Sequence, residues 1–213
     1  MLIDAVEWLG HSGFRIQAGR ESIYIDPYRA PDGPPAAVIL ITHGHYDHFS
    51  PQDVERLSGE GTTLVAPAPV AERLTGQVRS IAPGEALELG RIDVRAIAAY
   101  NTSKRDPSGN LFHPRESGWV GYELRIGGER LYHSGDTDVI PEMDEVAGVD
   151  VALLAVSGVY VMTPGEAAEA ARRIQPALAV PMHWGEHIGT RADAEAFADR
   201  APVEVRILEK ATD

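Results

Sequence analysis

Residues 37–54, AVILITHGHYDHFSPQDV, decide the fold of this chain because they join a buried strand to a capped helix through a histidine-rich turn. The apolar run 37–41 is typical of a central strand that is buried on both faces. Residues 50–53, SPQD, supply an N-cap serine, a proline at the first helical position and a carboxylate three residues after the cap. Phe49 and Val54 are placed to form a hydrophobic staple around this helix start. We therefore predict a strand, a sharp turn and a helix in direct succession.

The turn between this strand and this helix carries four potential metal ligands, which are His43, His45, Asp47 and His48. Histidines two residues apart on an extended segment point the same way, and Gly44 lets the backbone turn tightly between them. Imidazole nitrogens and carboxylate oxygens suit zinc, manganese or iron. The alternative is a histidine-rich surface turn, but four ligands at one strand-to-helix junction favour a metal site.

Two further predicted strands are each followed by a potential ligand. Asp136 follows a predicted strand in HSGDT, residues 133–137, and His183 follows the apolar run 178–180. Taken alone, Asp136 is a common turn residue, and His183 is either a core residue or a ligand. Their shared position at strand ends favours metal binding for both, and the two oxygens of a carboxylate can bridge two cations.

Alternating or continuous apolar residues predict the remaining elements. We expect strands at residues 5–9, 14–17, 22–25, 92–98, 119–126, 130–133, 151–156, 178–180 and 203–208. Further helices are expected after Thr163 and Thr190, both of which begin N-capping sequences. Residues 100–118 form a long irregular stretch, and such loops are usually functional or mobile. We expect residues 1–213 to form a single domain, with helices layered outside packed sheets.

Composition restricts the function. The 213 residues carry a formal net charge of −13, which disfavours a nucleic-acid partner. The chain has no cysteine, no membrane-spanning apolar run and no secretion signal, so we expect a cytoplasmic protein without membrane attachment. The expected partner is a small molecule, and an anionic one is allowed because a bound cation can dominate the local field. The sequence leaves a homo-oligomer open.

The THGHYDH run at 42–48, the GDT at 135–137 and His183 after a hydrophobic strand together resemble the metallo-β-lactamase superfamily. The opening WLGHSGF, residues 8–14, resembles the branch that includes L-ascorbate-6-phosphate lactonase. This resemblance implies an α/β fold, a four-layer αββα sandwich of two mixed β-sheets flanked by helices.

The resemblance also implies how two divalent cations are held. His43 and His45 would bind the first cation, the second would be bound by Asp47, His48 and His183, and Asp136 would bridge the two. The place of a third histidine for the first cation reads AAYN, residues 98–101. We expect His113 to replace it, with Asn101 as the alternative. Zinc or manganese is the expected metal, with iron and nickel left open.

The remaining histidines have weaker signals. His11 lies on the turn between the first two strands, where it either binds substrate or transfers a proton, or else packs beside Trp8. We expect His133 to hydrogen-bond a metal ligand. No specific role is predicted for His187.

The ligand set predicts a hydrolase that uses metal-activated water. The resemblance to the lactonase branch implies a small ester, a lactone or a phosphorylated sugar derivative as its substrate. Asp47 or Asp136 would orient the nucleophile or accept its proton. The alternatives are a phosphodiesterase or N-acyl phospholipid hydrolase, a di-iron redox protein, and a metal-binding protein without catalysis. Covalent acyl catalysis has no support, since the chain lacks cysteine and any G-x-S-x-G sequence.

Overall fold

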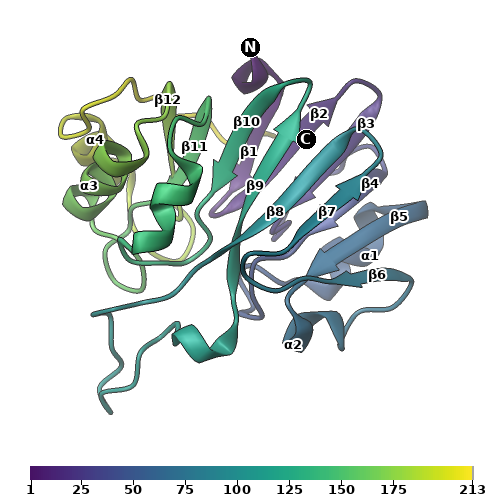
Figure 1. Cartoon of the computed structure of the whole chain (residues 1–213), viewed down its shortest axis with the longest axis horizontal. Helices are drawn as coiled ribbons and strands as arrows, with labels where there is room; N and C mark the ends of the chain where they lie inside the picture. Colours follow the sequence, from purple (N-terminus) through teal and green to yellow (C-terminus); the bar gives the residue numbers. More distant parts are fainter. Residues whose placement is uncertain (213) are drawn as a thin grey trace.

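Two six-stranded β-sheets organise the computed structural model, which describes residues 1–212 (Figure 1). The first sheet has the order β1-β2-β3-β4-β5-β6, formed by β1 (Val6–Gly10), β2 (Gly13–Ala18), β3 (Glu21–Ile25), β4 (Ala36–Leu40), β5 (Ser58–Ala66) and β6 (Gln77–Ser80). The second has the order β12-β11-β10-β9-β8-β7, formed by β7 (Ala86–Leu89), β8 (Ile92–Ala98), β9 (Val120–Ile126), β10 (Glu129–His133), β11 (Val151–Ala155) and β12 (Leu178–Met182). Both sheets are mixed, because β3 to β6 and β10 to β12 pair in parallel while the other neighbours are antiparallel.

The helices are α1 (Pro51–Leu57), α2 (Ala68–Ala71), α3 (Pro164–Ile174) and α4 (Arg191–Ala198), with 3-10 turns at Leu2–Ala5, Arg115–Ser117 and Pro141–Val146. Three of the helices, α1, α3 and α4, begin where their capping sequences predict, and the short α2 has no side-chain cap among the described residues. Ser50 Oγ accepts a hydrogen bond from the Asp53 backbone N–H at 3.3 Å at the start of α1. Thr163 and Glu166 form a complete capping box at the start of α3.

Apolar side chains form two cores on the two faces of the first sheet. Val38 and Leu40 of β4 belong to the larger core, which fills the space between the sheets and continues under α3 and α4. Ile39 and the following Ile41 belong to a smaller core beneath α1 and α2. Figure 1 shows the helix pairs on opposite sides of the molecule. The predicted four-layer αββα sandwich is therefore confirmed, and β4 is buried on both faces as its apolar run indicates.

One predicted strand is wrong. Residues 203–208 form no strand, although they run beside β12 and make an isolated bridge between Ala179 and Val205. The backbone N–H of Ala179 donates to Glu204 O at 2.9 Å, so only a single register position is paired. Conversely, β5, β6, β7 and α2 lie in residues 58–89, where the spacing of apolar residues predicts neither a strand nor a helix. Strand β5 forms on the parallel template of β4, and β6 and β7 are short and largely exposed.

Parallel pairing determines where loops meet. The carboxyl ends of neighbouring parallel strands lie along one edge of a sheet, and binding sites in such sheets collect there. The loops that follow β3 and β4 in the first sheet and β10, β11 and β12 in the second supply most of the polar side chains described below. Within residues 1–212, no helix is long and apolar enough to cross a membrane.

Candidate metal centre

Eight side chains predicted to form the site come together at the strand ends. They are His11 on the turn between β1 and β2, His43, His45, Asp47 and His48 after β4, His113 in the loop from β8 to β9, Asp136 after β10 and His183 after β12. Most of these side chains are buried, and only His45 and Asp47 are partly exposed. The structure therefore places every predicted ligand and both predicted catalytic residues in one cluster.

The first ligand group consists of His43, His45 and His113, whose ligating atoms all lie within 4.8 Å of one another. His43 Nε2 and His45 Nδ1 are 3.1 Å apart. The indole ring of Trp119 packs against all three imidazoles, with ring centroids 5.0, 4.8 and 5.5 Å away. His113 thus completes the group that lacks a histidine at residues 98–101.

Asn101 lies behind His113 instead of joining the ligand group. Its Oδ1 accepts hydrogen bonds from the His113 backbone N–H at 2.9 Å and from the ring Nδ1–H at 2.8 Å. Its Nδ2 donates to Asp138 Oδ1 at 3.2 Å and to Tyr160 O at 2.9 Å. Because both partners of Nδ2 are acceptors, the amide orientation is set, and His113 Nε2 carries the free lone pair.

The second ligand group consists of His11, Asp47, His48 and His183, again with ligating atoms within 4.8 Å of one another. His183 Nδ1 is hydrogen-bonded to Ser157 Oγ at 2.9 Å. The His183 backbone has a positive φ of 61°, and its N–H donates to His11 O at 2.8 Å. These contacts direct His183 Nε2 into the cluster.

Asp26 fixes the ring of His48. His48 Nδ1–H donates to Asp26 Oδ2 at 2.7 Å, and Thr42 donates to the same carboxylate from its hydroxyl at 2.6 Å and from its backbone N–H at 2.8 Å. The Thr42 hydroxyl in turn lies 3.0 Å from His43 Nδ1. One buried carboxylate therefore orients two predicted ligands, as carboxylates commonly do behind metal-binding histidines.

Asp136 lies between the two groups. Its Oδ2 is 3.2 Å from His113 Nε2, 3.1 Å from His183 Nε2 and 3.9 Å from His43 Nε2. Its Oδ1 is 3.3 Å from His48 Nε2. Oδ2 thus faces His43 and His113 of the first group and His183 of the second, and Oδ1 faces His48 of the second, so the carboxylate contacts both ligand groups.

The donor atoms at this centre fit a cation. The buried atoms His48 Nε2, His113 Nε2, His183 Nε2 and Asp136 Oδ1 have no hydrogen-bond partner within residues 1–212. Buried polar atoms are normally paired, so four such atoms gathered around Asp136 indicate that a positively charged partner binds there. Nitrogen and oxygen donors without thiolate suit a divalent cation such as zinc or manganese.

Burial and neighbouring charges set the protonation of these groups. Burial lowers the pKa of His43 and His45, and the nearby histidines lower both further. Burial opposes ionisation of Asp136, but His183 and His48 hold its pKa well below the ordinary value. Burial also opposes charging His48, yet Asp136 and Asp26 raise its pKa well above the usual range.

His11 is fully buried beside Asp47, with 3.0 Å between His11 Nε2 and Asp47 Oδ2. Burial lowers the pKa of His11 to about 4, although the bond to Asp47 opposes this shift. Trp8 does not pack on the His11 ring, since its indole N–H donates to His11 O at 2.9 Å and its ring lies against Trp184. The position at the metal centre thus favours a role in binding or proton transfer over simple packing.

The role predicted for His133 is wrong. Its Nε2–H donates to Ser12 O at 2.9 Å, and its Nδ1 accepts from the Gly135 N–H at 3.1 Å. It therefore holds the backbone beside His11 and Asp136 and contacts no ligand side chain. His187, which had no predicted role, bonds Tyr28 OH through Nε2 at 2.9 Å near the mouth of the site.

Asp26 and Ser157 support the predicted ligands but belong to none of the sequence motifs that predict the site. Each comes directly or nearly directly after a buried parallel strand, β3 for Asp26 and β11 for Ser157. Asp26 and Ser157 thus share with Asp136 and His183 a position just after a buried strand, and this is the sequence signal that points to them.

Comparisons with known proteins agree with this fold. A family model described as a beta-lactamase superfamily domain matches residues 5–183. A UPF0173 metal-dependent hydrolase of Methanopyrus kandleri is 30% identical over 224 residues, covering 96% of each chain. Another from Symbiobacterium thermophilum is 32% identical and covers 92% of this chain and 90% of its own.

Solved structures show the same relationship. The crystal structure of a metal-dependent hydrolase from Parabacteroides distasonis superposes with a TM-score of 0.86 at 30% identity, covering 97% of this chain and 93% of that one. A metallo hydrolase from Ignicoccus hospitalis shares the fold with a TM-score of 0.79 at 21% identity, covering 97% and 95% of the two chains. The chain therefore belongs to the β-lactamase superfamily and, within it, to the UPF0173 family of metal-dependent hydrolases.

Proposed function

We propose that this metal-dependent hydrolase cleaves a small ester or lactone at the cluster around Asp136. The observation that carries the proposal is the set of four buried donor atoms without partners, on His48, His113, His183 and Asp136. The sequence resemblance to the L-ascorbate-6-phosphate lactonase branch supports the same reaction class and adds phosphorylated sugar derivatives to the expected substrates.

In this proposal, His43, His45 and His113 hold one cation, Asp47, His48 and His183 hold a second, and Asp136 bridges them. Divalent cations in such a ligand set supply Lewis acidity and make water a nucleophile near neutral pH. The donor chemistry supports zinc or manganese. Asn101, Asp26 and Ser157 hold the ligands His113, His48 and His183 in the orientation that faces the cluster.

The residues of the chain would manage the proton. Burial opposes ionisation of Asp47, but the hydrogen bond from His11 and the nearby His48 together lower its pKa below the ordinary value. An ionised Asp47 orients the attacking water and accepts its proton. His11 donates Nε2–H to Asp47 and so stabilises the carboxylate in the orientation that this step requires. No serine or cysteine nucleophile takes part.

Elemental analysis of the purified chain tests the metal requirement. We expect about two equivalents of zinc or manganese per chain, with a lower content in His48→Ala and Asp136→Ala. Asp199→Ala, a change on the exposed end of α4, is the matched control and should keep the wild-type content. The same preparations are then assayed with simple lactones, aryl esters and bis(p-nitrophenyl) phosphate.

Each result has a definite meaning. Ester or lactone hydrolysis that falls with metal content supports the proposal. Hydrolysis of the phosphodiester alone would favour the phosphodiesterase alternative. Iron with a redox-active spectrum and no hydrolysis would favour a di-iron redox protein. Bound metal without any turnover would favour a metal-binding protein, and a failure to bind metal after reconstitution would overturn the ligand assignment.

A further inference from the structure

A small pocket with aromatic walls opens directly over the metal centre. Its volume is about 230 Å³, and its floor includes His45 and Asp136. Three aromatic side chains line it, and each comes from a different loop: Tyr46 after β4, Phe112 between β8 and β9, and Tyr160 after β11. The pocket is smaller than the 300–1,000 Å³ that is usual for drug-sized ligands, and a cavity of about 150 Å³ is enough for benzene. It therefore has room for one ring and a reacting group.

Two of the aromatic residues that line this pocket, Tyr46 and Tyr160, are exposed, and the exposed Val159 precedes Tyr160 in the chain. Among residues 1–212, four large hydrophobic side chains are exposed, and Tyr46 (66%), Val159 (49%) and Tyr160 (38%) are three of them. The fourth, Met1, lies at the chain terminus. Clustered exposed apolar side chains on a folded protein mark binding sites, whereas single ones carry no such meaning.

The aromatic walls are held in place before any ligand binds. The rings of Phe112 and Tyr160 meet edge to face, with centroids 4.7 Å apart and an interplanar angle of 84°. Asn101 Nδ2 donates to Tyr160 O, so the residue that orients His113 also holds this wall. On the other side, the Tyr46 ring contacts Tyr28 edge-on at 6.1 Å.

The pocket lining contains no lysine or arginine among the residues that the structure describes. The lysine and arginine side chains on segments beside the pocket lie next to carboxylates that do not line it. Lys104 Nζ donates to both oxygens of Glu166 at 2.8 Å, and Lys210 is paired with Glu186. Arg29 Nη1 is 4.0 Å from the same Glu186 carboxylate.

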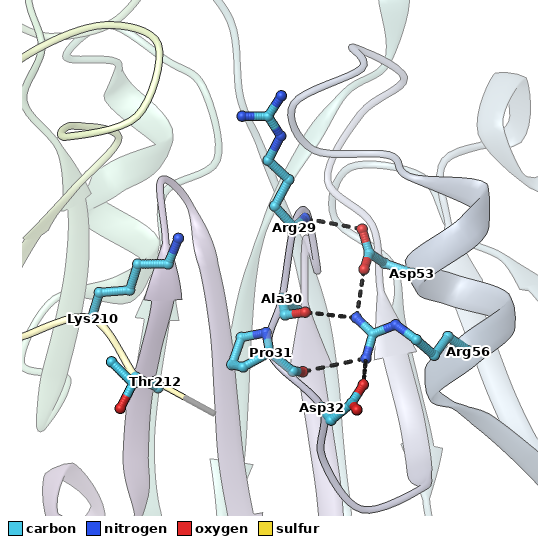
Figure 2. Close-up of a pocket in the computed structure, with 9 residues that line it drawn as sticks. Arg29, Ala30, Pro31, Asp32, Asp53, Arg56, Lys210 and Thr212 are labelled. Atoms are coloured by element: carbon cyan, nitrogen blue, oxygen red, sulfur yellow. Dashed lines mark hydrogen bonds and ion pairs between the residues drawn. The ribbon is translucent and has the colours of Figure 1, made fainter.

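A separate hollow of about 540 Å³ beside α1 concentrates cations but contains none of the predicted ligands (Figure 2). The guanidinium of Arg56 there bonds the carboxylates of Asp53 and Asp32 and the carbonyl of Ala30. Figure 2 shows the Arg29 side chain directed away from this network. The Arg29 guanidinium lies over the Tyr28 ring, 5.3 Å from its centroid, so it stands behind the Tyr46 wall and does not line the pocket. A phosphate inside the aromatic pocket would therefore meet no lysine or arginine among the described lining residues.

We propose, on the basis of the hydrolase function proposed above, that the substrate is a neutral ester or lactone carrying one aromatic ring. The ring packs between Tyr46 and the Phe112–Tyr160 pair while the carbonyl group faces the metal centre. Water oxygen bonds to the carbonyl carbon, the C–O bond to the alcohol breaks, and the alcohol leaves with one proton. This proposal disfavours phosphorylated sugars as substrates, because their phosphate group would place a negative charge among uncharged aromatic rings.

Two aryl esters of similar intrinsic reactivity test the charge preference in the metal-loaded full chain. Phenyl acetate is neutral, and 4-acetoxybenzoate has the same ring with a carboxylate. We expect kcat/KM to be about tenfold higher for phenyl acetate. Tyr46→Ala should raise KM for phenyl acetate more than it lowers kcat, and Tyr46→Phe, which keeps the ring, should restore KM. Phe112→Ala tests the opposite wall in the same way, and all variants should retain the wild-type metal content.

A binding measurement separates this inference from the hydrolase proposal. Ligand-observed NMR compares acetophenone with 4-acetylbenzoate, neither of which has a bond to hydrolyse. Preferential binding of acetophenone that Tyr46→Ala removes would support the aromatic pocket even if no ester were turned over, and in that case only the hydrolase proposal would fail. Ester turnover with equal or better use of 4-acetoxybenzoate, or with KM unchanged in Tyr46→Ala and Phe112→Ala, would overturn the substrate assignment while leaving the hydrolase function intact.

Discussion

Asn101 and His113 are joined by two hydrogen bonds to one oxygen, because Asn101 Oδ1 accepts both the backbone N–H and the ring Nδ1–H of His113. They are twelve residues apart in the loop between β8 and β9, and the Asn101 N–H also donates to His113 O at 2.8 Å. This pair closes the loop and directs His113 Nε2 toward Asp136, 3.2 Å away. A histidine from this loop can therefore join the first ligand group, although residues 98–101 at the end of β8 contain no histidine.

Removal of the Asn101 amide should weaken the first metal site. Loss of partners behind a metal-binding histidine commonly costs about 10- to 100-fold in metal affinity. We expect Asn101→Ala to lower the affinity for the more weakly bound of the two metal ions by a factor in that range. Titration with a metal indicator measures this affinity. Asn110→Ala, an exposed change in the same loop, should retain wild-type affinity. Unchanged metal affinity in Asn101→Ala would show that His113 needs no support or is not a ligand.

Asp26 should matter for both stability and metal binding. It accepts hydrogen bonds from His48 Nδ1–H and from the hydroxyl and N–H of Thr42, all of them buried. Asp26→Ala leaves these donors unpaired, and each unpaired buried group costs about 1–3 kcal/mol. Urea unfolding of the metal-free chain should show a loss of several kcal/mol. A variant as stable as Asp4→Ala, an exposed control, would contradict this account.

Gly121 of β9 leaves space for the backbone that leads to Asp136, the proposed bridging ligand. A Cβ atom at Gly121 would lie 2.5 Å from His133 O and 2.7 Å from Ser134 O, and both are backbone atoms. Gly121→Ala should therefore destabilise the chain by about 1–3 kcal/mol, the usual cost of overpacking. Gly165→Ala on α3, where a Cβ meets nothing within 4 Å, is the matched control. Thermal unfolding measures both, and equal melting temperatures for the two variants would contradict the steric argument.

The Lys104–Glu166 ion pair should make stability depend on pH. Partial burial disfavours ionisation of Glu166, but Lys104 and the backbone N–H of Thr163 outweigh it and lower its pKa below the ordinary value of 4.5. Because the folded pKa is the lower one, the carboxylate stabilises the fold above about pH 4.5, and this contribution is lost as pH falls through the folded pKa.

Glu166→Gln should reveal that contribution. The exposed part of the pair is screened by solvent, so we expect the variant to lose about 0.2–1 kcal/mol at pH 7. The difference from wild type should shrink as the pH falls below 4.5 in chelator-treated samples. Urea unfolding at several pH values provides the measurement. A difference that stays constant or grows toward acid pH would assign the effect of Glu166 to packing and not to its charge.

The amino-acid sequence by itself determined the parts of this protein that depend on neighbours along the chain. The run from Thr42 to His48 places four potential ligands between a buried strand and a capped helix, and the caps at Ser50 and Thr163 set where α1 and α3 begin. Period and capping are local properties, because a strand alternates every two residues and a cap acts within one turn of helix. These signals were enough to predict the layered fold and most of the candidate ligands.

Only the tertiary structure decided which distant groups meet these ligands. His113 rather than Asn101 joins His43 and His45 because the loop between β8 and β9 closes on itself before it reaches the site. Asp26 reaches His48 because β3 and β4 are parallel neighbours whose carboxyl ends share one edge. Residues 203–208, which have the pattern of a strand, find only one paired position beside β12. Such outcomes depend on chain closure and on the register between strands, and no local pattern of residue types specifies either of these.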